Sequence, residues 1–126
     1  MKNIFALLGS VSALLGVVLG AFGAHALKQT LSPDMLAIFE TGVRYQMYHS
    51  FALFVTAWAA RNSPNINFSR AGWAFVVGIV LFSGSLYALT LTDVREFGFV
   101  TPLGGVAFLV GWFLLAVGFW KQRHSA

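Results

Sequence analysis

Four apolar runs alternate with short polar connections along the chain. They cover residues 4–24, 43–60, 71–91 and 102–120, and the first contains no charged residue. An α-helix rises 1.5 Å per residue, so about 20 residues cross the hydrocarbon core of a bilayer, which is roughly 30 Å thick. The pattern therefore predicts an all-α fold, a four-helix transmembrane bundle made by a single domain, residues 1–126. We expect the first run to be a retained span, because it is longer than the apolar part of a signal peptide.

Local signals indicate where helices begin and where the chain turns. Ser32-Pro33 is typical of an N-cap followed by proline at the first helical position, and Thr101-Pro102 repeats this signal. Residues 34–40 then form a short amphipathic helix that leads into the second span. Asn62-Ser63-Pro64-Asn65 is typical of a turn. We expect structure of its own only in the first connection, residues 27–41.

The composition agrees with a membrane protein. Of 126 residues, 58% are hydrophobic and only 10% are charged, which excludes both a water-soluble globular fold and a disordered chain. The absence of cysteine excludes disulfides and thiolate chemistry. The net charge of +4 comes from residues scattered at segment ends, so we expect no nucleic-acid partner.

The basic residues instead predict the orientation of the spans. Alternating spans put five Lys and Arg residues and no acid on the side of the termini: Lys2, Arg61, Arg70, Lys121 and Arg123. The other side holds Lys28, Arg44 and Arg95 with all four acids. Because cytoplasmic loops carry the excess of Lys and Arg, we expect a multi-pass protein with both termini in the cytoplasm.

Small residues form stripes along three of the runs. They alternate at spacings of three and four residues, and lipid-embedded helices approach one another closely at such positions. The predicted packing positions are Gly9, Ala13, Gly16, Gly20 and Gly23 in the first run, Gly78 in the third, and Gly104 and Gly111 in the fourth. This spacing averages 3.5 residues and favours a tight bundle.

Polar residues crowd the start of the second span and include Arg44, Tyr45, Gln46 and His49. Glu40 and Arg44 are four residues apart, which suits an ion pair, while an unpaired Arg44 would face a substrate anion. His49 is the most embedded ionisable residue, and His25 ends the first run, so we expect both at comparable depth near the outer side. Four interpretations stay open for this pair: hydrogen bonds that lock helix ends, axial ligation of haem, a metal site completed by Asp34 or Glu40, and a proton relay or quinone head-group site.

A second polar group lies in the outer half of the third span. Ser83, Ser85 and Tyr87 stand there, and the fourth span opens at Thr101 with its backbone N–H groups exposed. We expect His25, His49, Tyr87, Arg95 and this helix start to surround one outward-facing polar cleft. Serine hydrolase and phosphate-loop motifs are absent from the sequence.

Five ordered motifs resemble a known family. They are Gly20-Ala21-Phe22-Gly23-Ala24-His25, Tyr45-Gln46 with His49, Leu81 to Tyr87, Thr101-Pro102 with Gly104-Gly105, and Phe108-Leu109 with Gly111-Trp112. Together they resemble the uncharacterised membrane-protein family called domain of unknown function 423, which includes small bacterial inner-membrane proteins and human transmembrane protein 256. The resemblance implies a compact multi-pass protein of the bacterial cytoplasmic membrane and brings no established substrate, reaction or cofactor.

The sequence favours a non-enzymatic protein, because no nucleophile–base pair can be named. We expect it to bind a small ligand, lipid or partner in the outward polar cleft. One alternative is a redox protein that binds haem or quinone through His25 and His49, and another is a small oligomeric transporter or channel. The expected partners are bilayer lipid and either a second copy of the chain or another membrane protein.

Overall fold

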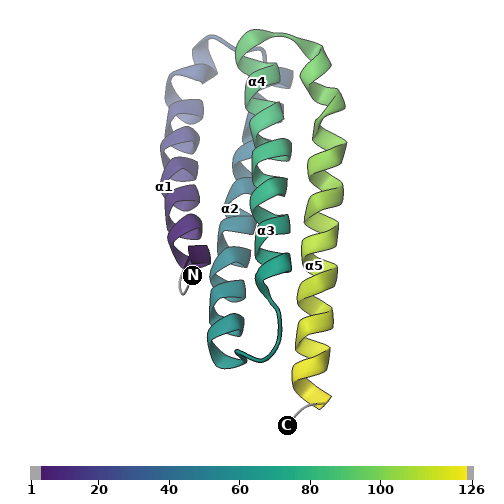
Figure 1. Cartoon of the computed structure of the whole chain (residues 1–126). Coiled ribbons are helices and arrows are strands. Elements are labelled where there is room, and N and C mark those ends of the chain that lie inside the picture. Colours follow the sequence, from purple (N-terminus) through teal and green to yellow (C-terminus); the bar gives the residue numbers. More distant parts are fainter. Residues whose placement is uncertain (1–3, 125–126) are drawn as a thin grey trace.

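A computed structural model describes residues 4–124 and shows long helices lying side by side (Figure 1). The helices are α1 (Ile4–His25), α2 (Pro33–Asn62), α3 (Ser69–Gly78), α4 (Gly84–Thr92) and α5 (Thr101–His124). A π-helical turn, η2 (Ile79–Ser83), joins α3 and α4 into one continuous helical segment, which we call the rod. Two 3-10 turns lie in the connections: η1 (Leu27–Gln29) after α1 and η3 (Arg95–Phe99) after α4. Residues 4–124 contain no strand, so the prediction of an all-α four-helix bundle is confirmed.

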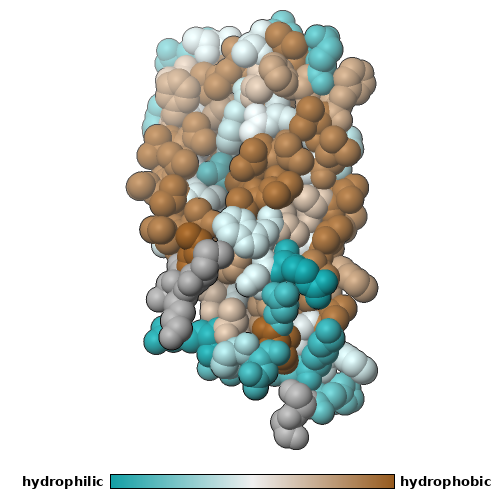
Figure 2. Space-filling model, viewed as in Figure 1, coloured by the Kyte–Doolittle hydropathy of each residue, from teal (hydrophilic) through white to brown (hydrophobic). Residues whose placement is uncertain are grey.

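Three segments are long and apolar enough to cross a membrane: Ile4–Gln29, Ser69–Thr92 and Arg95–His124. The helix α2 is long enough but not apolar enough to be one of these segments, because it carries many of the polar residues. It lies between α1 on one side and the α3–η2–α4 rod on the other, and four of its polar residues are buried in the bundle: Gln46, His49, Ser50 and Thr56. Figure 2 shows the resulting surface, with apolar residues around the middle and hydrophilic residues gathered towards the ends.

Three features of the fold differ from the sequence prediction. The expected lead-in helix and second span are one continuous helix, which begins at Pro33 and is capped by Ser32, whose Oγ accepts a hydrogen bond from the Met35 N–H at 3.2 Å. The connection after α4 also has structure, since Asp93 adopts a left-handed φ of 60°, ends α4 and leads into η3. The π-helical turn was not predicted, because an apolar run carries no signal for one extra residue per turn.

Aromatic rings seated on glycines join α5 to the rod beside it. A Cβ added at Gly104, Gly111 or Gly118 would come within 3.0 Å of Phe82, Phe75 or Phe68 respectively. Both series repeat every seven residues and run in opposite directions. Gly111 and Gly118 therefore meet the rings of Phe75 and Phe68, whereas Gly104 meets the backbone and Cβ of Phe82. Phe108 packs in the reverse sense against Gly78. The missing side chains therefore bring the two helices together.

The α1–α2 contact follows the same rule. Gly9 faces the backbone carbonyl of Ser50, Gly16 faces Met47, and Gly23 faces Phe39. In each predicted stripe every second member is buried and the others are half-buried. On α1, the buried Gly9, Gly16 and Gly23 alternate with the half-buried Ala13 and Gly20. This is the outcome expected when a seven-residue repeat of small residues faces a neighbouring helix.

Candidate functional site

A polar network crosses the bundle between α1, α2 and α4. The Tyr87 hydroxyl donates to Gln46 Oε1 at 2.6 Å, and Gln46 Nε2 donates to the Ser12 carbonyl at 2.8 Å. Ser50 Oγ is hydrogen-bonded to Ser12 Oγ at 2.7 Å. These hydrogen bonds provide partners for polar groups that lipid cannot hydrogen-bond, so they fix the register of the three helices.

Two further hydrogen bonds use the serines of the third run. Ser83, on the π-helical turn, donates to the Gly42 carbonyl at 2.6 Å, and Ser85 Oγ lies 2.5 Å from Thr101 Oγ1 at the start of α5. Within residues 4–124 no buried side-chain nitrogen or oxygen lacks a partner. These serines and Thr101 therefore join helices to one another.

His49 is buried at mid-bundle with both ring nitrogens engaged. Nδ1 lies 2.7 Å from the Tyr45 carbonyl, and Trp112 Nε1 lies 3.0 Å from Nε2. A carbonyl only accepts and an indole N–H only donates, so the imidazole is neutral with its proton on Nδ1. Its ring stacks on Phe108 at a centroid distance of 3.5 Å and an interplanar angle of 6°. This side chain has no lone pair left for a metal or haem iron.

The expectation that His25 and His49 lie at one depth is wrong. Phe39 faces Gly23, which is two residues from His25. His49 is ten residues further along α2, about 15 Å along the helix axis. His25 is also exposed. The two rings therefore cannot hold one haem between them, and residues 4–124 contain no group of three His, Cys, Asp or Glu that could hold a metal ion.

The expected convergence on an outward cleft is also absent. Tyr87 and Thr101 make hydrogen bonds inside the bundle, whereas Arg95 is exposed and lies 4.0 Å from Asp93. This is the one ion pair among residues 4–124, so Glu40 and Arg44 are not paired. Arg44 donates instead to Thr41 Oγ1 at 3.1 Å. Charge spacing on a helix permits a pair, but an exposed pair gains too little to enforce it.

A groove of about 450 Å³ opens to the side of the bundle between α2 and α5. Aromatic side chains form most of its wall, which consists of Tyr45, Tyr48, His49, Phe82, Gly105, Phe108, Leu109 and Trp112. Trp112 stands next to the midpoint of the apolar run 102–120 and Gly105 near its start, so the groove lies along this candidate membrane span. We call it the lateral groove.

Two unpartnered hydroxyls and one open glycine distinguish the lateral groove. The side chains of Tyr45 and Tyr48 are 38% and 53% exposed, and neither hydroxyl has a hydrogen-bond partner within residues 4–124. A Cβ added at Gly105 would meet no atom within 4 Å, unlike one added at Gly104. The sequence analysis proposed Tyr45 as a binding residue but not Tyr48, and Phe108 and Trp112 entered it only as part of a family motif, because aromatic residues are equally common on lipid-facing surfaces.

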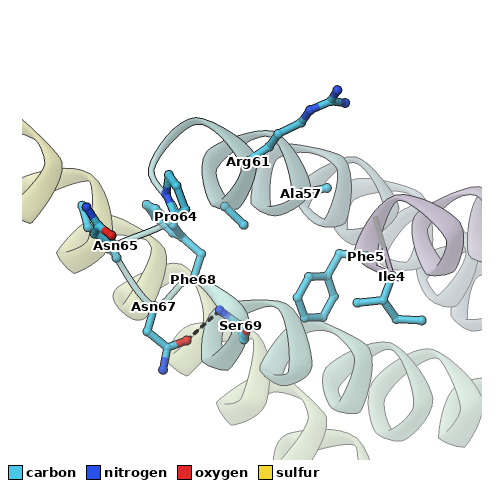
Figure 3. Close-up of a pocket in the computed structure, with 11 residues that line it drawn as sticks. Ile4, Phe5, Ala57, Arg61, Pro64, Asn65, Asn67, Phe68 and Ser69 are labelled. Carbon is cyan, nitrogen blue, oxygen red and sulfur yellow. Dashed lines mark hydrogen bonds between the residues drawn. The ribbon is translucent and has the colours of Figure 1, made fainter. Parts of the chain in front are cut away.

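A larger cavity of about 740 Å³ lies at the end of the bundle formed by the α2–α3 connection (Figure 3). It is lined by Ile4, Phe5, Ala57, Ala60, Arg61, Pro64, Asn65, Ile66, Asn67, Phe68 and Ser69. The sequence predicted the turn at residues 62–65 but no cavity, since the cavity depends on where α1 begins relative to α2. We call it the end cavity.

Comparison with known proteins agrees with the resemblance in the sequence. A Bacillus subtilis protein named UPF0382 membrane protein YwdK is 48% identical over 116 residues, which cover 91% of this chain and 94% of that protein. A UPF0382 membrane protein of Haemophilus influenzae is 40% identical over 124 residues, 98% of each chain. No solved structure matches significantly. The family model described as Protein of unknown function (DUF423) matches residues 19–105. The chain therefore belongs to the DUF423 family of membrane proteins.

Proposed function

We propose that this protein is a non-enzymatic membrane protein that binds a flat, lipid-soluble molecule of the quinone class in the lateral groove. The observation that carries the proposal is the pair of unpartnered hydroxyls, Tyr45 and Tyr48, in a groove that lies along the apolar run of α5. The hydrocarbon core of a bilayer supplies no hydrogen-bond partner, so a hydroxyl left without one there costs free energy. A ligand carbonyl that accepts from these hydroxyls would remove this cost.

The walls of the groove favour a ring. Tyr45, Phe82 and Phe108 pack against one another with centroid distances of 4.7 to 6.5 Å, so they line it with aromatic faces and edges. Such surfaces prefer planar partners in stacked or edge-to-face contact. A quinone ring has this shape and carries carbonyl acceptors, and its isoprenoid tail would remain in the bilayer.

Gly105 leaves the space that such a ring needs. The adjacent Gly104 has no side chain because the backbone of Phe82 approaches it, but no protein atom approaches Gly105 in the same way. Internal packing therefore gives no reason for a glycine there, whereas a ligand in the groove does.

His49 serves in this proposal as a fixed part of the groove floor. The hydrogen bond from Trp112 and the stack on Phe108 hold its ring in one position. The ligand is bound by its shape and by the tyrosine hydroxyls, and His25 takes no part.

The test is binding of decylubiquinone to the purified protein, measured by quenching of tryptophan fluorescence. We expect saturable quenching in the wild type, weakened about tenfold or more in Gly105→Leu, which fills the groove. Each of Tyr45→Phe and Tyr48→Phe removes one hydroxyl and should weaken binding about fivefold, the equivalent of about 1 kcal/mol.

The matched control is Gly84→Leu, since Gly84 is the other glycine at which an added Cβ meets nothing within 4 Å, and it does not line the groove. This variant should bind like the wild type. Quenching that is equal in the wild type and Gly105→Leu would refute the proposal. Equal binding of decanol, which supplies a tail without a ring, would refute the assignment to quinones.

A further inference from the structure

The end cavity lies outside the lateral groove and exists because the helices differ in length. Helix α1 has 22 residues from Ile4, whereas α2 has 30 and extends past the start of α1 (Figure 1). The last turns of α2, the 63–68 connection and the start of α3 therefore enclose a space that α1 does not fill. Its volume of about 740 Å³ is in the range of ligand pockets in proteins.

The interior of the end cavity is apolar and its rim is polar. Phe5 and Phe68 are 5% and 1% exposed, and Ala57 and Ile4 complete the inner wall. Asn65 and Asn67 belong to the exposed connection, where Asn67 Oδ1 accepts from the Ser69 N–H at 3.0 Å. In Figure 3 the Arg61 side chain extends away from Phe5, so its guanidinium group lies outside the cavity.

The end of the bundle around the cavity carries positive charge without acids. Arg61 and Arg70 flank the connection, and Lys121 and Arg123 lie on the last turns of α5 beside it, as the hydrogen bond from Gln122 to Ser63 places them. All four acids, Asp34, Glu40, Asp93 and Glu96, lie at the other end of the helices. Within residues 4–124 these cations have no ion-pair partner. An anion at the rim would therefore be attracted by a positive electrostatic field that no nearby acidic residue compensates.

We propose that the end cavity binds an anionic glycerophospholipid, with one acyl chain inside and the phosphate at the rim beside Arg61 and Arg70. The apolar interior excludes a free phosphate ion as the occupant, because nothing inside the cavity would solvate it. The basic rim selects an anionic head group over a zwitterionic one, since polybasic segments attract anionic lipids of the cytoplasmic leaflet. This second site is independent of the lateral groove.

The test is lipid selectivity measured on the full chain. The protein is reconstituted with equal amounts of phosphatidylglycerol and phosphatidylcholine, extracted in mild detergent and weighed by native mass spectrometry. We expect one phosphatidylglycerol to be retained in preference to phosphatidylcholine. The Arg61→Gln/Arg70→Gln variant should lose this preference by about fivefold for each arginine removed.

Two controls make the result specific. Lys28→Gln/Arg95→Gln removes the same charge from the opposite end and should leave the retained phosphatidylglycerol unchanged. Ala57→Leu reduces the cavity while keeping the rim and should lower retention, with circular dichroism used to verify the fold. Equal retention of both lipids, an equal loss in the Lys28→Gln/Arg95→Gln control, or displacement of the lipid by excess glycerophosphoglycerol, which has no acyl chain, would each overturn the proposal.

Discussion

Adjacent glycines at the start of α5 should respond in opposite ways to the same substitution. A Cβ at Gly104 would lie 2.7 Å from the Phe82 Cα, and real Cβ contacts essentially never fall below 3.0 Å. The obstacle is backbone, which cannot rotate away as a side chain can. A Cβ at Gly105 meets no atom within 4 Å. Gly104→Ala therefore has to separate two helices, whereas Gly105→Ala adds a methyl group to open space.

The magnitudes follow from these distances. Overpacking costs about 1–3 kcal/mol, and Gly104→Ala belongs near the upper end because the contact between α5 and the backbone of η2 must shift. Gly105→Ala should stabilise by about 0.5–1 kcal/mol, because alanine loses less conformational entropy than glycine in a helix. The two variants should thus differ in unfolding free energy by about 2–4 kcal/mol.

The assay is unfolding of the purified protein in mixed micelles with increasing dodecyl sulfate, followed by circular dichroism. Both variants have the same composition, so differences in detergent binding by the unfolded chain cancel. A shift of the same sign and size in the two variants would contradict the packing between α5 and the rod. A stabilised Gly104→Ala would do so most directly.

Three further predictions concern other contacts. His49→Ala should destabilise the protein by about 2–4 kcal/mol in the same assay, because it removes the Trp112 bond and the Phe108 stack, whereas His124→Ala should change it by less than about 0.5 kcal/mol. Gly16→Leu, which meets Met47, should destabilise more than Gly20→Leu, which meets Val43 at 3.4 Å, and equal effects would place the stripe against lipid. An absorption spectrum of protein from haem-supplemented cells should show no Soret band that shifts on reduction, since His49 has no free nitrogen; such a band, lost in His49→Ala, would overturn the hydrogen-bond assignment.

The stripes of small residues illustrate how far the sequence leads. Their seven-residue repeat predicts which face of a helix is packed, and Gly9, Gly16 and Gly23 are indeed buried in α1. The repeat does not predict the partner. Phenylalanines 68, 75 and 82 repeat every seven residues too, but an apolar ring packs equally well against lipid, so nothing in the sequence pairs them with glycines of another helix.

The candidate site shows the same division. The sequence drew attention to Gln46, His49, Ser83 and Tyr87 because polar residues are costly in a membrane. Their partners are Ser12, Trp112, Gly42 and Gln46, which lie 34 to 63 residues away from them in the chain. Helical periodicity predicts the face on which a residue lies, but it gives no information about how far the neighbouring helix is shifted along the bundle axis. For this reason the sequence predicts His25 and His49 at the same depth.

By itself, the sequence determined that this chain is a helical membrane protein with helices near residues 4–24, 71–91 and 102–120. These properties depend on local hydropathy and on capping residues, which act over one or two turns. The tertiary structure alone decided the register between helices, the ring-on-glycine contacts, the lateral groove and the end cavity. Each of these depends on which side chains meet across a gap between helices, and that is set by the packing of the whole bundle.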